Sequence, residues 1–175
     1  MKKYSKLALE DCCKVALDTN HIMGTLAALD FIKEGLNACI LGPSDSGKSY
    51  LAKALGIQAC LKYRTSYHHC EELLESMVAL KQTDYPKYQK KVFFFMKLDL
   101  LILDDFLLHT VTDERKIKVL FEIMEKRSEL CKSTIVRSQR EPNSWASMIL
   151  NDEVPANSIL KRATKYYTVV IKPRE

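Results

Sequence analysis

The chain has 175 residues, of which 47% are hydrophobic and 28% are charged, and its formal net charge is +5. This length and this apolar fraction suit one compact domain with a substantial core, and they exclude an intrinsically disordered chain. The mildly basic balance is compatible with a nucleic-acid partner but does not establish one.

Neither the amino-terminal segment nor the longest apolar run has the features of a membrane or export sequence. In MKKYSKLALEDCCKVAL, Glu10 and Asp11 interrupt the segment before an apolar stretch develops, so it is a poor signal peptide. The run LDLLILDDFLL is broken by carboxylates and is too short to cross a bilayer. We therefore expect a cytoplasmic protein without membrane contact. The six cysteines show no C-x-x-C spacing and are expected to be reduced and structural.

The predicted elements alternate between strands and helices along the chain. Strands are expected at 37–41, 62–67, 98–105, 133–139 and 166–172. Helices are expected at 47–61, 69–80, 85–97, from Thr112 or Asp113 to about 131, 143–150 and 157–163. Strands separated by helices indicate a parallel sheet with helices on both faces, an α/β fold. With no linker or repeat, we expect a single domain, 1–175, with a lead-in at 1–36 and a core at 37–172.

The clearest motif lies between the first strand and the helix that follows it. The segment GPSDSGKS matches the phosphate-loop pattern G-x-x-x-x-G-K-[ST] at every required position. A chance match in a chain of this length is on the order of one in a hundred at average residue usage. The motif and the next residue define the predicted nucleotide contacts: Gly42, Pro43, Ser44, Asp45, Ser46, Gly47, Lys48, Ser49 and Tyr50.

Each part of this loop has a physical role toward a nucleotide. Glycines allow backbone N–H groups to face inward, and the following helix adds the positive end of its dipole. Lys48 is predicted to reach the β- and γ-phosphates, and Ser49 is predicted to offer its hydroxyl to Mg²⁺. Asp45 stands where many such loops have glycine, and its carboxylate would repel phosphates unless it points to solvent.

A pair of carboxylates ends the most strand-like run, LDLLILDDF. In a parallel sheet the carboxyl ends of strands border the ligand crevice. Asp104 is therefore predicted to complete the Mg²⁺ site opposite Ser49, and Asp105 to orient or deprotonate an attacking water. The alternative is a solvated turn after a buried strand. A guanine-specific [NT]-K-x-D motif is absent, since TKYY at 164–167 lacks the aspartate, so ATP is favoured.

Three segments together give the chain a family resemblance: LAALDFIKEGLNACILGPSDSGKSYLAKALG, LDLLILDDF and SILKRATKYYTVVIK. From about 26 to 172 the chain resembles the IstB-like ATPases, helper proteins of insertion-sequence transposition. These are relatives of the DnaC and DnaI helicase loaders within the AAA+ superfamily. The resemblance implies a P-loop fold with a five-stranded sheet of order 5-1-4-3-2, ATP bound between subunits of a homo-oligomer, and partners that include DNA and a transposase or replicative helicase.

The resemblance also assigns roles to two further residues. Gln139 falls at the sensor position, which is usually Asn in this group, and its extra methylene puts the hydrolysis rate in question. Arg162 matches the arginine finger that reaches the γ-phosphate of the adjacent subunit, a task that suits a planar, always-charged guanidinium. Its alternative role is that of a solvated arginine on a short helix.

The basic segment DYPKYQKKVFFFMK matches a helix that faces single-stranded DNA in related initiators and loaders. Lys87, Lys90 and Lys91 would neutralise phosphates, and Tyr85 and Tyr88 could stack on bases. The alternative is a solvated helix face that the three phenylalanines at 93–95 anchor to the core.

The chain ends soon after the last predicted strand, so we expect no carboxyl-terminal lid domain and little room for a partner-binding domain. A shortened relative, one domain of a longer protein and a decayed mobile-element copy all satisfy this pattern. The leading functional hypothesis is an ATP-hydrolysing transposition helper on DNA, with a helicase loader as the alternative. Two hypotheses from other classes are an ATP-binding switch with negligible turnover and a small-molecule kinase, the latter disfavoured by the second carboxylate.

Overall fold

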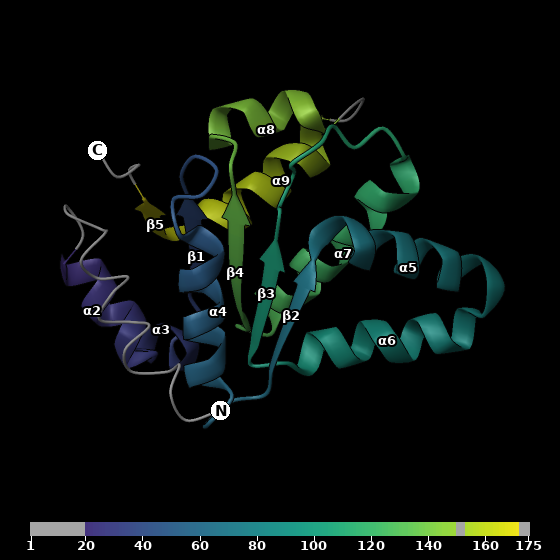
Figure 1. Ribbon diagram of the computed structural model, residues 1–175. Helices are drawn as coiled ribbons and strands as arrows, with labels where there is room; N and C mark the ends of the chain where they lie inside the picture. Colours follow the sequence, from purple (N-terminus) through teal and green to yellow (C-terminus); the bar gives the residue numbers. More distant parts are fainter. Residues whose placement is uncertain (1–19, 150–152, 172–175) are drawn as a thin grey trace.

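Five parallel strands form the central sheet of the computed structural model, which describes residues 20–149 and 153–171 (Figure 1). The strands are β1 (Asn37–Leu41), β2 (Thr65–His69), β3 (Leu100–Asp104), β4 (Ser133–Ser138) and β5 (Tyr166–Val170). Their order across the sheet is β2-β3-β4-β1-β5. Counted from the β5 edge this is 5-1-4-3-2, so the predicted α/β fold and strand order are confirmed.

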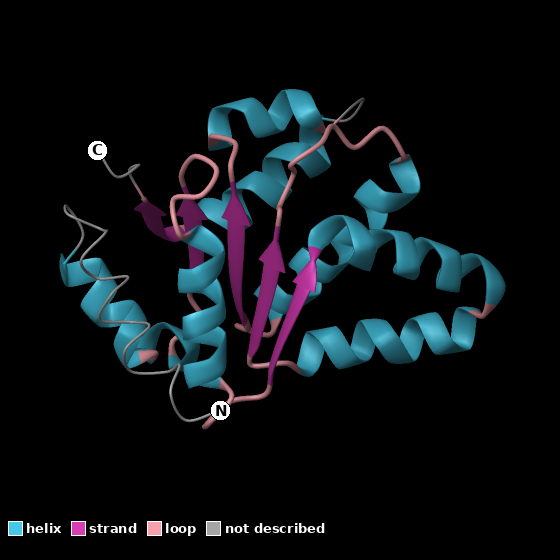
Figure 2. Ribbon diagram, viewed as in Figure 1, coloured by secondary structure: helices cyan, strands magenta, loops and turns pink. Residues whose placement is uncertain are grey.

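Helices cover both faces of this sheet (Figure 2). On one face lie α2 (Asn20–Ala28), α3 (Asp30–Lys33) and α4 (Lys48–Ala59). On the other lie α5 (Cys70–Thr83), α6 (Tyr85–Lys97), α7 (Glu114–Glu129) and α9 (Glu153–Thr164). The short helix α8 (Pro142–Met148) lies beyond the carboxyl end of β4. No helix of the described ranges combines the length and the apolar character needed to cross a membrane.

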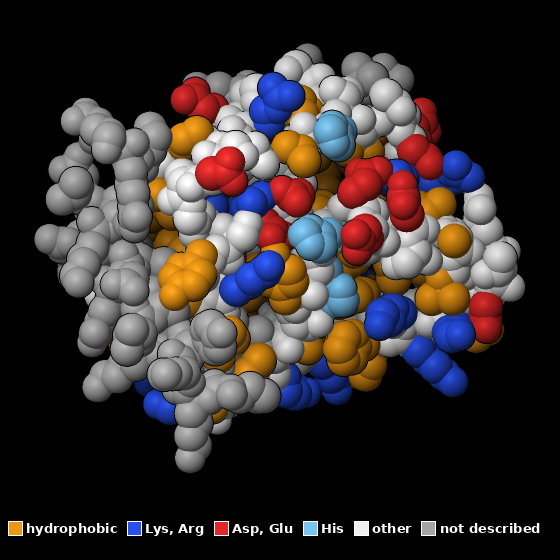
Figure 3. Space-filling view, in the orientation of Figure 1, with side chains coloured by type: hydrophobic (Ala, Val, Ile, Leu, Met, Phe, Trp, Pro, Cys, Tyr) orange, Lys and Arg blue, Asp and Glu red, His pale blue; other side chains and the backbone are white. Residues whose placement is uncertain are grey.

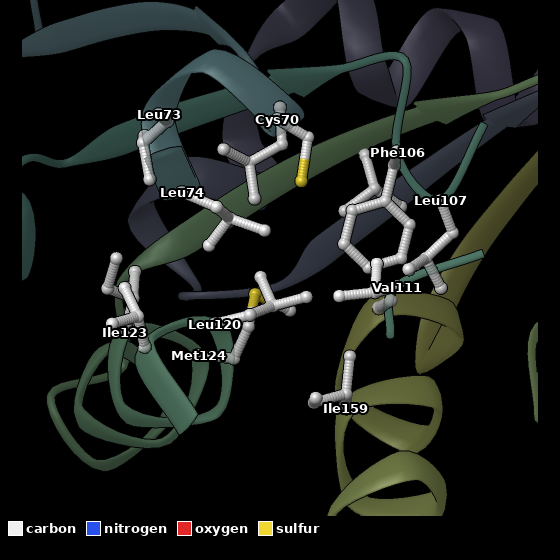
Figure 4. Packing of buried hydrophobic residues seen from close by; sticks show 14 of the residues in the cluster. Cys70, Leu73, Leu74, Phe106, Leu107, Val111, Leu120, Ile123, Met124 and Ile159 are labelled. Carbon is white, nitrogen blue, oxygen red and sulfur yellow. The ribbon is translucent and has the colours of Figure 1, made fainter. Parts of the chain in front are cut away.

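Successive side chains of each strand point to opposite faces of the sheet, so the core consists of two clusters, one on each face. In β3, Leu100 and Ile102 face α4, whereas Leu101 and Leu103 face the α5 and α7 side, and all four are buried. Figure 4 shows the second cluster, in which Leu73 and Leu74 of α5, Leu120, Ile123 and Met124 of α7, and Ile159 of α9 lie close together. Because both faces are covered, β1 and β3 are buried along their whole length and are nearly continuous apolar runs.

One boundary error concerns the second strand, predicted at 62–67 and observed at Thr65–His69. The amides of Lys62 and Tyr63 donate to the carbonyl of Ala59 at 3.0 and 2.8 Å, so these two residues continue the end of α4. His69 instead pairs with Asp104 in the ladder to β3. Pairing with the neighbouring strand therefore overrides the local β-propensity of the earlier residues.

Other boundaries also differ from the prediction or lie outside the described residues. The helix expected at 69–80 runs to Thr83, and the one expected at 157–163 begins at Glu153. Positions 150 and 172, the expected ends of a helix and of the last strand, lie outside the described residues, as do positions 1–19 of the lead-in. The domain limits and the absence of a lid stay predictions.

A buried arginine connects three elements at the amino-terminal edge of the sheet. Arg127 of α7 is 1% exposed, and it donates to the carbonyls of Phe95, Leu98 and Ser133 and to the hydroxyl of Thr134, at 3.0 Å for Leu98 and for Thr134. Burial lowers the pKa of Arg127 to about 9. The guanidinium thus satisfies buried acceptors at the end of α6 and the start of β4.

We predict that Arg127→Met lowers the free energy of unfolding by about 3 kcal/mol, because it leaves buried oxygen acceptors without a donor while keeping the apolar volume. Urea denaturation followed by circular dichroism measures this change. The control is Lys126→Met, which removes a partly exposed cation from the next position and should change stability by no more than about 0.5 kcal/mol. Equal effects of the two substitutions would contradict the anchoring role of Arg127.

Candidate functional site

The loop at 42–47 connects β1 to α4 at the carboxyl-terminal ends of the strands. Its backbone requires glycine at both ends of the loop. Gly42 has φ 152° and Gly47, the N-cap of α4, has φ 90°. A Cβ on Gly42 would lie 2.4 Å from the carbonyl oxygen of Ile171 and 2.9 Å from Ser46 Oγ. The motif glycines therefore serve the conformation of the loop, as predicted from the sequence.

Lys48 lies inside this loop rather than on the surface. Its side chain belongs to a residue that is only 1% exposed, and its ammonium donates to the carbonyl of Pro43 and, at 3.4 Å, to Ser46 Oγ. Burial lowers the pKa of Lys48, and the positive charge of Arg137 acts in the same direction, whereas Asp104 opposes it. The ammonium is thus directed at the space that the loop surrounds.

The remaining loop residues are mostly exposed. Pro43, Ser44 and Asp45 are open to solvent, and Ser44 Oγ donates to the Asp45 carboxylate at 3.4 Å. Tyr50 is 45% exposed on the first turn of α4. Because the carboxylate of Asp45 is solvated, its repulsion of a phosphate group is screened.

The acidic pair lies at the same edge, beside the loop. Asp104 ends β3 and is 2% exposed, so the alternative of a solvated turn does not describe it. The Tyr67 hydroxyl donates to Asp104 Oδ2, and the backbone N–H of Asp105 donates to Asp104 Oδ1 at 2.9 Å. Burial and the bond to Asp104 raise the pKa of Tyr67, which keeps its proton on the phenol. The carboxylate is therefore oriented by its neighbours.

One residue that the sequence analysis did not single out joins these groups. The guanidinium of Arg137 donates to Ser49 Oγ through Nη2, pairs with Asp105 through Nη1, and places Nε 2.9 Å from Asp104 Oδ1. The contact of Nε is an ion pair without hydrogen-bond alignment. Figure 3 shows acidic side chains and histidines around the carboxyl ends of β2 and β3. The available sequence signal was an arginine directly after the apolar pair Ile135 and Val136 in the predicted strand STIVRSQ.

The fold class implies a magnesium ion beside the nucleotide, and the site can be compared with that requirement. The hydroxyl of Ser49 and the carboxylate of Asp104 are oxygen ligands of the kind that Mg²⁺ prefers. However, the guanidinium of Arg137 contacts both of them. A dication and this side chain cannot share one position, so the observed arrangement does not accept the metal.

The structure separates the two residues assigned by resemblance. Gln139 directly follows β4 and is half-buried at the edge where the loop lies, without a side-chain hydrogen bond to the described part of the chain. Arg162 lies near the amino-terminal ends of the strands. There its carbonyl accepts from Asn37 Nδ2 at 2.8 Å, and its guanidinium pairs with Glu125 of α7. Arg162 therefore cannot reach its own phosphate loop, and its action on a neighbouring subunit stays a prediction.

The predicted DNA-facing helix is α6, where Lys87, Lys90 and Lys91 are exposed. Figure 3 shows basic side chains over this helix. The prediction that Tyr88 stacks on bases is wrong, because Tyr88 is 2% exposed and its hydroxyl donates to Glu122 at 2.7 Å.

The alternative prediction, in which all three phenylalanines at 93–95 anchor α6 to the core, is also wrong. Only Phe95 is in the core, whereas Phe93 and Phe94 are 54% and 46% exposed. Their ring faces are contacted by lysines: Lys97 lies 4.4 Å from the Phe93 centroid, and Lys91 lies 5.1 Å from that of Phe94. Helix α6 thus presents both apolar and basic groups to solvent.

The sheet order, the phosphate loop and the carboxylate pair define a P-loop protein with the AAA+ fold. Residues 8–173 match the family model of the IstB-like ATP binding protein, so the chain belongs to this family. It is 31% identical over 144 residues to the "Insertion sequence IS232 putative ATP-binding protein" of Bacillus thuringiensis subsp. berliner, which covers 82% of this chain and 56% of that protein. It is 36% identical over 135 residues to the "Putative insertion sequence ATP-binding protein y4pL" of Sinorhizobium fredii, covering 76% and 53%.

Solved structures agree on the fold. A "Replication initiator DnaA bound to AMPPCP and single-stranded DNA" is similar with a TM-score of 0.74 at 21% identity, over 99% of this chain and 51% of that one. A DnaC helicase loader is similar with a TM-score of 0.68 at 21% identity, over 93% and 99%. At such identity the likeness concerns the fold alone. The chain spans little more than half the length of the insertion-sequence relatives named above.

The loop geometry generates a prediction on stability. Gly42→Ala should destabilise the fold by about 1–3 kcal/mol, because the new Cβ would collide with the Ile171 carbonyl at a backbone conformation unfavourable for alanine. Chemical denaturation measures the change. Gly24→Ala is the matched control, since Gly24 is helical and nothing lies within 4 Å of a Cβ built there. A loss at Gly24 as large as that at Gly42 would contradict the steric explanation.

Proposed function

We propose that this chain binds ATP at its phosphate loop and acts on DNA as a helper of transposition. The observation that carries the proposal is the meeting of Lys48, Ser49, Asp104 and Asp105 at one edge of the sheet, next to amides at the start of α4. Membership of the IstB-like ATP binding family supports the nucleotide. The names of the insertion-sequence relatives support the role in transposition.

The chemistry of nucleotide binding follows from the loop. Backbone amides at the start of α4, together with the helix dipole, favour an anion at that point. The buried ammonium of Lys48 adds a full positive charge directed at the same space. The exposed side chain of Asp45 leaves the interior free of negative charge from the loop itself.

We also propose that the chain hydrolyses the bound ATP slowly. Asp105, the residue expected to orient the attacking water, is paired with Arg137, and its Oδ2 lies 3.3 Å from His69 Nδ1. A carboxylate whose two oxygens already contact a guanidinium and an imidazole is less accessible to an attacking water. This pairing also favours the second candidate function, an ATP-binding switch with negligible turnover.

The partners of the proposed function are DNA, a transposase and further copies of the chain, all in the cytoplasm. The exposed lysines of α6 supply the surface for DNA. Arg162, which lies away from its own phosphate loop, would act on the nucleotide of an adjacent subunit. A role in loading a replicative helicase is the competing hypothesis, and stimulation by a helicase rather than by a transposase would support it.

The test of nucleotide binding is the Lys48→Ala variant. We expect its ATP affinity, measured by isothermal titration calorimetry, to fall at least about tenfold, because a charge-assisted contact to phosphate is lost. Lys62→Ala, which removes an exposed lysine beyond the other end of α4, should bind as the wild type does. Steady-state phosphate release with and without DNA then separates slow hydrolysis from a switch. Unchanged ATP affinity of Lys48→Ala would contradict the proposed site.

The test of the DNA surface replaces Lys87, Lys90 and Lys91 together by alanine. We expect weaker binding to single-stranded DNA and a salt dependence shallower by about 2, because up to three phosphate contacts are lost at about 0.7 each. Fluorescence anisotropy over a range of salt concentrations measures both quantities. Alanine at the three exposed lysines Lys33, Lys62 and Lys118 is the matched control. An equal loss of DNA affinity in both triple variants would show that the change in net charge, and not the position of the lysines on α6, causes the loss.

A further inference from the structure

The side chain of Arg137 occupies the position between the loop and the acidic pair. Its three nitrogens contact Ser49, Asp104 and Asp105, and the side chain is only 11% exposed. A guanidinium held by one helix and by the residues that end the adjacent strand is part of the site rather than a surface group.

The strand register explains why Arg137 points there. In β4, Ile135 belongs to the cluster under α4, and Val136 belongs to the cluster on the opposite face. Arg137 therefore projects to the α4 side, where Ser49 lies in the first turn. Strand β4 is paired on both sides, with β1 and with β3, so the base of the side chain cannot move away from the site.

The surrounding bonds hold the guanidinium in place. Tyr67 donates to Oδ2 of Asp104, whereas Oδ1, which also accepts from the Asp105 N–H, lies next to Arg137. Asp105 approaches the same guanidinium from the turn after β3, with His69 on its other oxygen. Moving Arg137 out would leave the 3%-exposed carboxylate of Asp104 without its cation.

The charges at the site also disfavour a metal ion at this position. Lys48 and Arg137 contribute two positive charges, and Asp104 and Asp105 contribute two negative charges. A dication added between Ser49 and Asp104 would lie against the guanidinium, in surroundings where little water screens the repulsion. By contrast, a guanidinium beside a phosphate loop is well suited to a phosphate group, which it can bind through two parallel N–H donors.

We propose that Arg137 takes the place of the divalent cation, so that this chain binds ATP without magnesium. This inference rests on the proposed binding of ATP at the loop. The guanidinium stands beside Ser49, where it neutralises phosphate charge together with Lys48, and it remains tethered by Asp104 and Asp105. The chain would thus differ from P-loop proteins whose corresponding cation is a metal ion.

The experiment measures the affinity for ATP by isothermal titration calorimetry, once with magnesium chloride and once with excess EDTA. For the wild type we expect the two affinities to agree within about threefold, and for Arg137→Thr we expect magnesium to raise the affinity by at least about tenfold. Arg64→Thr is the matched control, since Arg64 is exposed beside Asp99 at the other edge of the sheet. Arg137→Lys, which keeps a charge without the planar fork, should lie between wild type and Arg137→Thr.

The outcomes are distinguishable. Wild-type binding that falls at least tenfold in EDTA overturns the role of Arg137 while leaving the proposed function intact, and this result needs no variant. Binding that is metal-independent in both wild type and Arg137→Thr also overturns it. Failure of the wild type to bind ATP in either buffer overturns the proposed function as well. Electron paramagnetic resonance with Mn²⁺ as the probe provides a second readout: bound Mn²⁺ in the Arg137→Thr complex with ATP, and none in the wild-type complex, supports the proposal.

Discussion

The buried carboxylate of Asp104 is the constraint on which the site depends. A charge that is only 2% exposed needs compensation, and here it receives a hydroxyl from Tyr67, a backbone N–H from Asp105 and a guanidinium from Arg137. These partners come from the two strands that flank β3, namely β2 and β4, and from the turn after β3. The same guanidinium contacts Ser49, so the demand of one carboxylate connects the sheet to the start of α4.

The parallel sheet makes this connection possible because all of its strands end at the same edge. The phosphate loop follows β1, the acidic pair follows β3, and Gln139 follows β4. At the amino-terminal ends of the strands the interactions are structural: Arg127 donates hydrogen bonds to carbonyls at the end of α6 and the start of β4. The carboxyl-terminal ends of the strands thus bring together the residues of the candidate site, whereas at the amino-terminal ends Arg127 satisfies backbone acceptors.

Family and fold answer different questions about this chain. The family model places it among IstB-like ATP binding proteins and its relatives are named as insertion-sequence proteins, whereas the likeness to DnaA and DnaC extends only to the architecture. The role proposed for Arg137 rests on its contacts in this chain and not on family membership. The charge at this position therefore decides how far general expectations about a P-loop site apply here.

The sequence by itself determined the strand order through its family resemblance, the phosphate loop through its motif, and most element positions through their apolar periodicity. β1 and α6 were placed to the residue, because the limits of both depend on local interactions; in the structure the Asp84 carboxylate at the start of α6 accepts from the Lys87 N–H. The second strand was misplaced, since its limits depend on pairing with β3, and the burial of Tyr88 depends on a contact with Glu122 of another helix. Only the tertiary structure revealed the position of Arg137, because the side chains around it are distant in sequence and meet where parallel strands end.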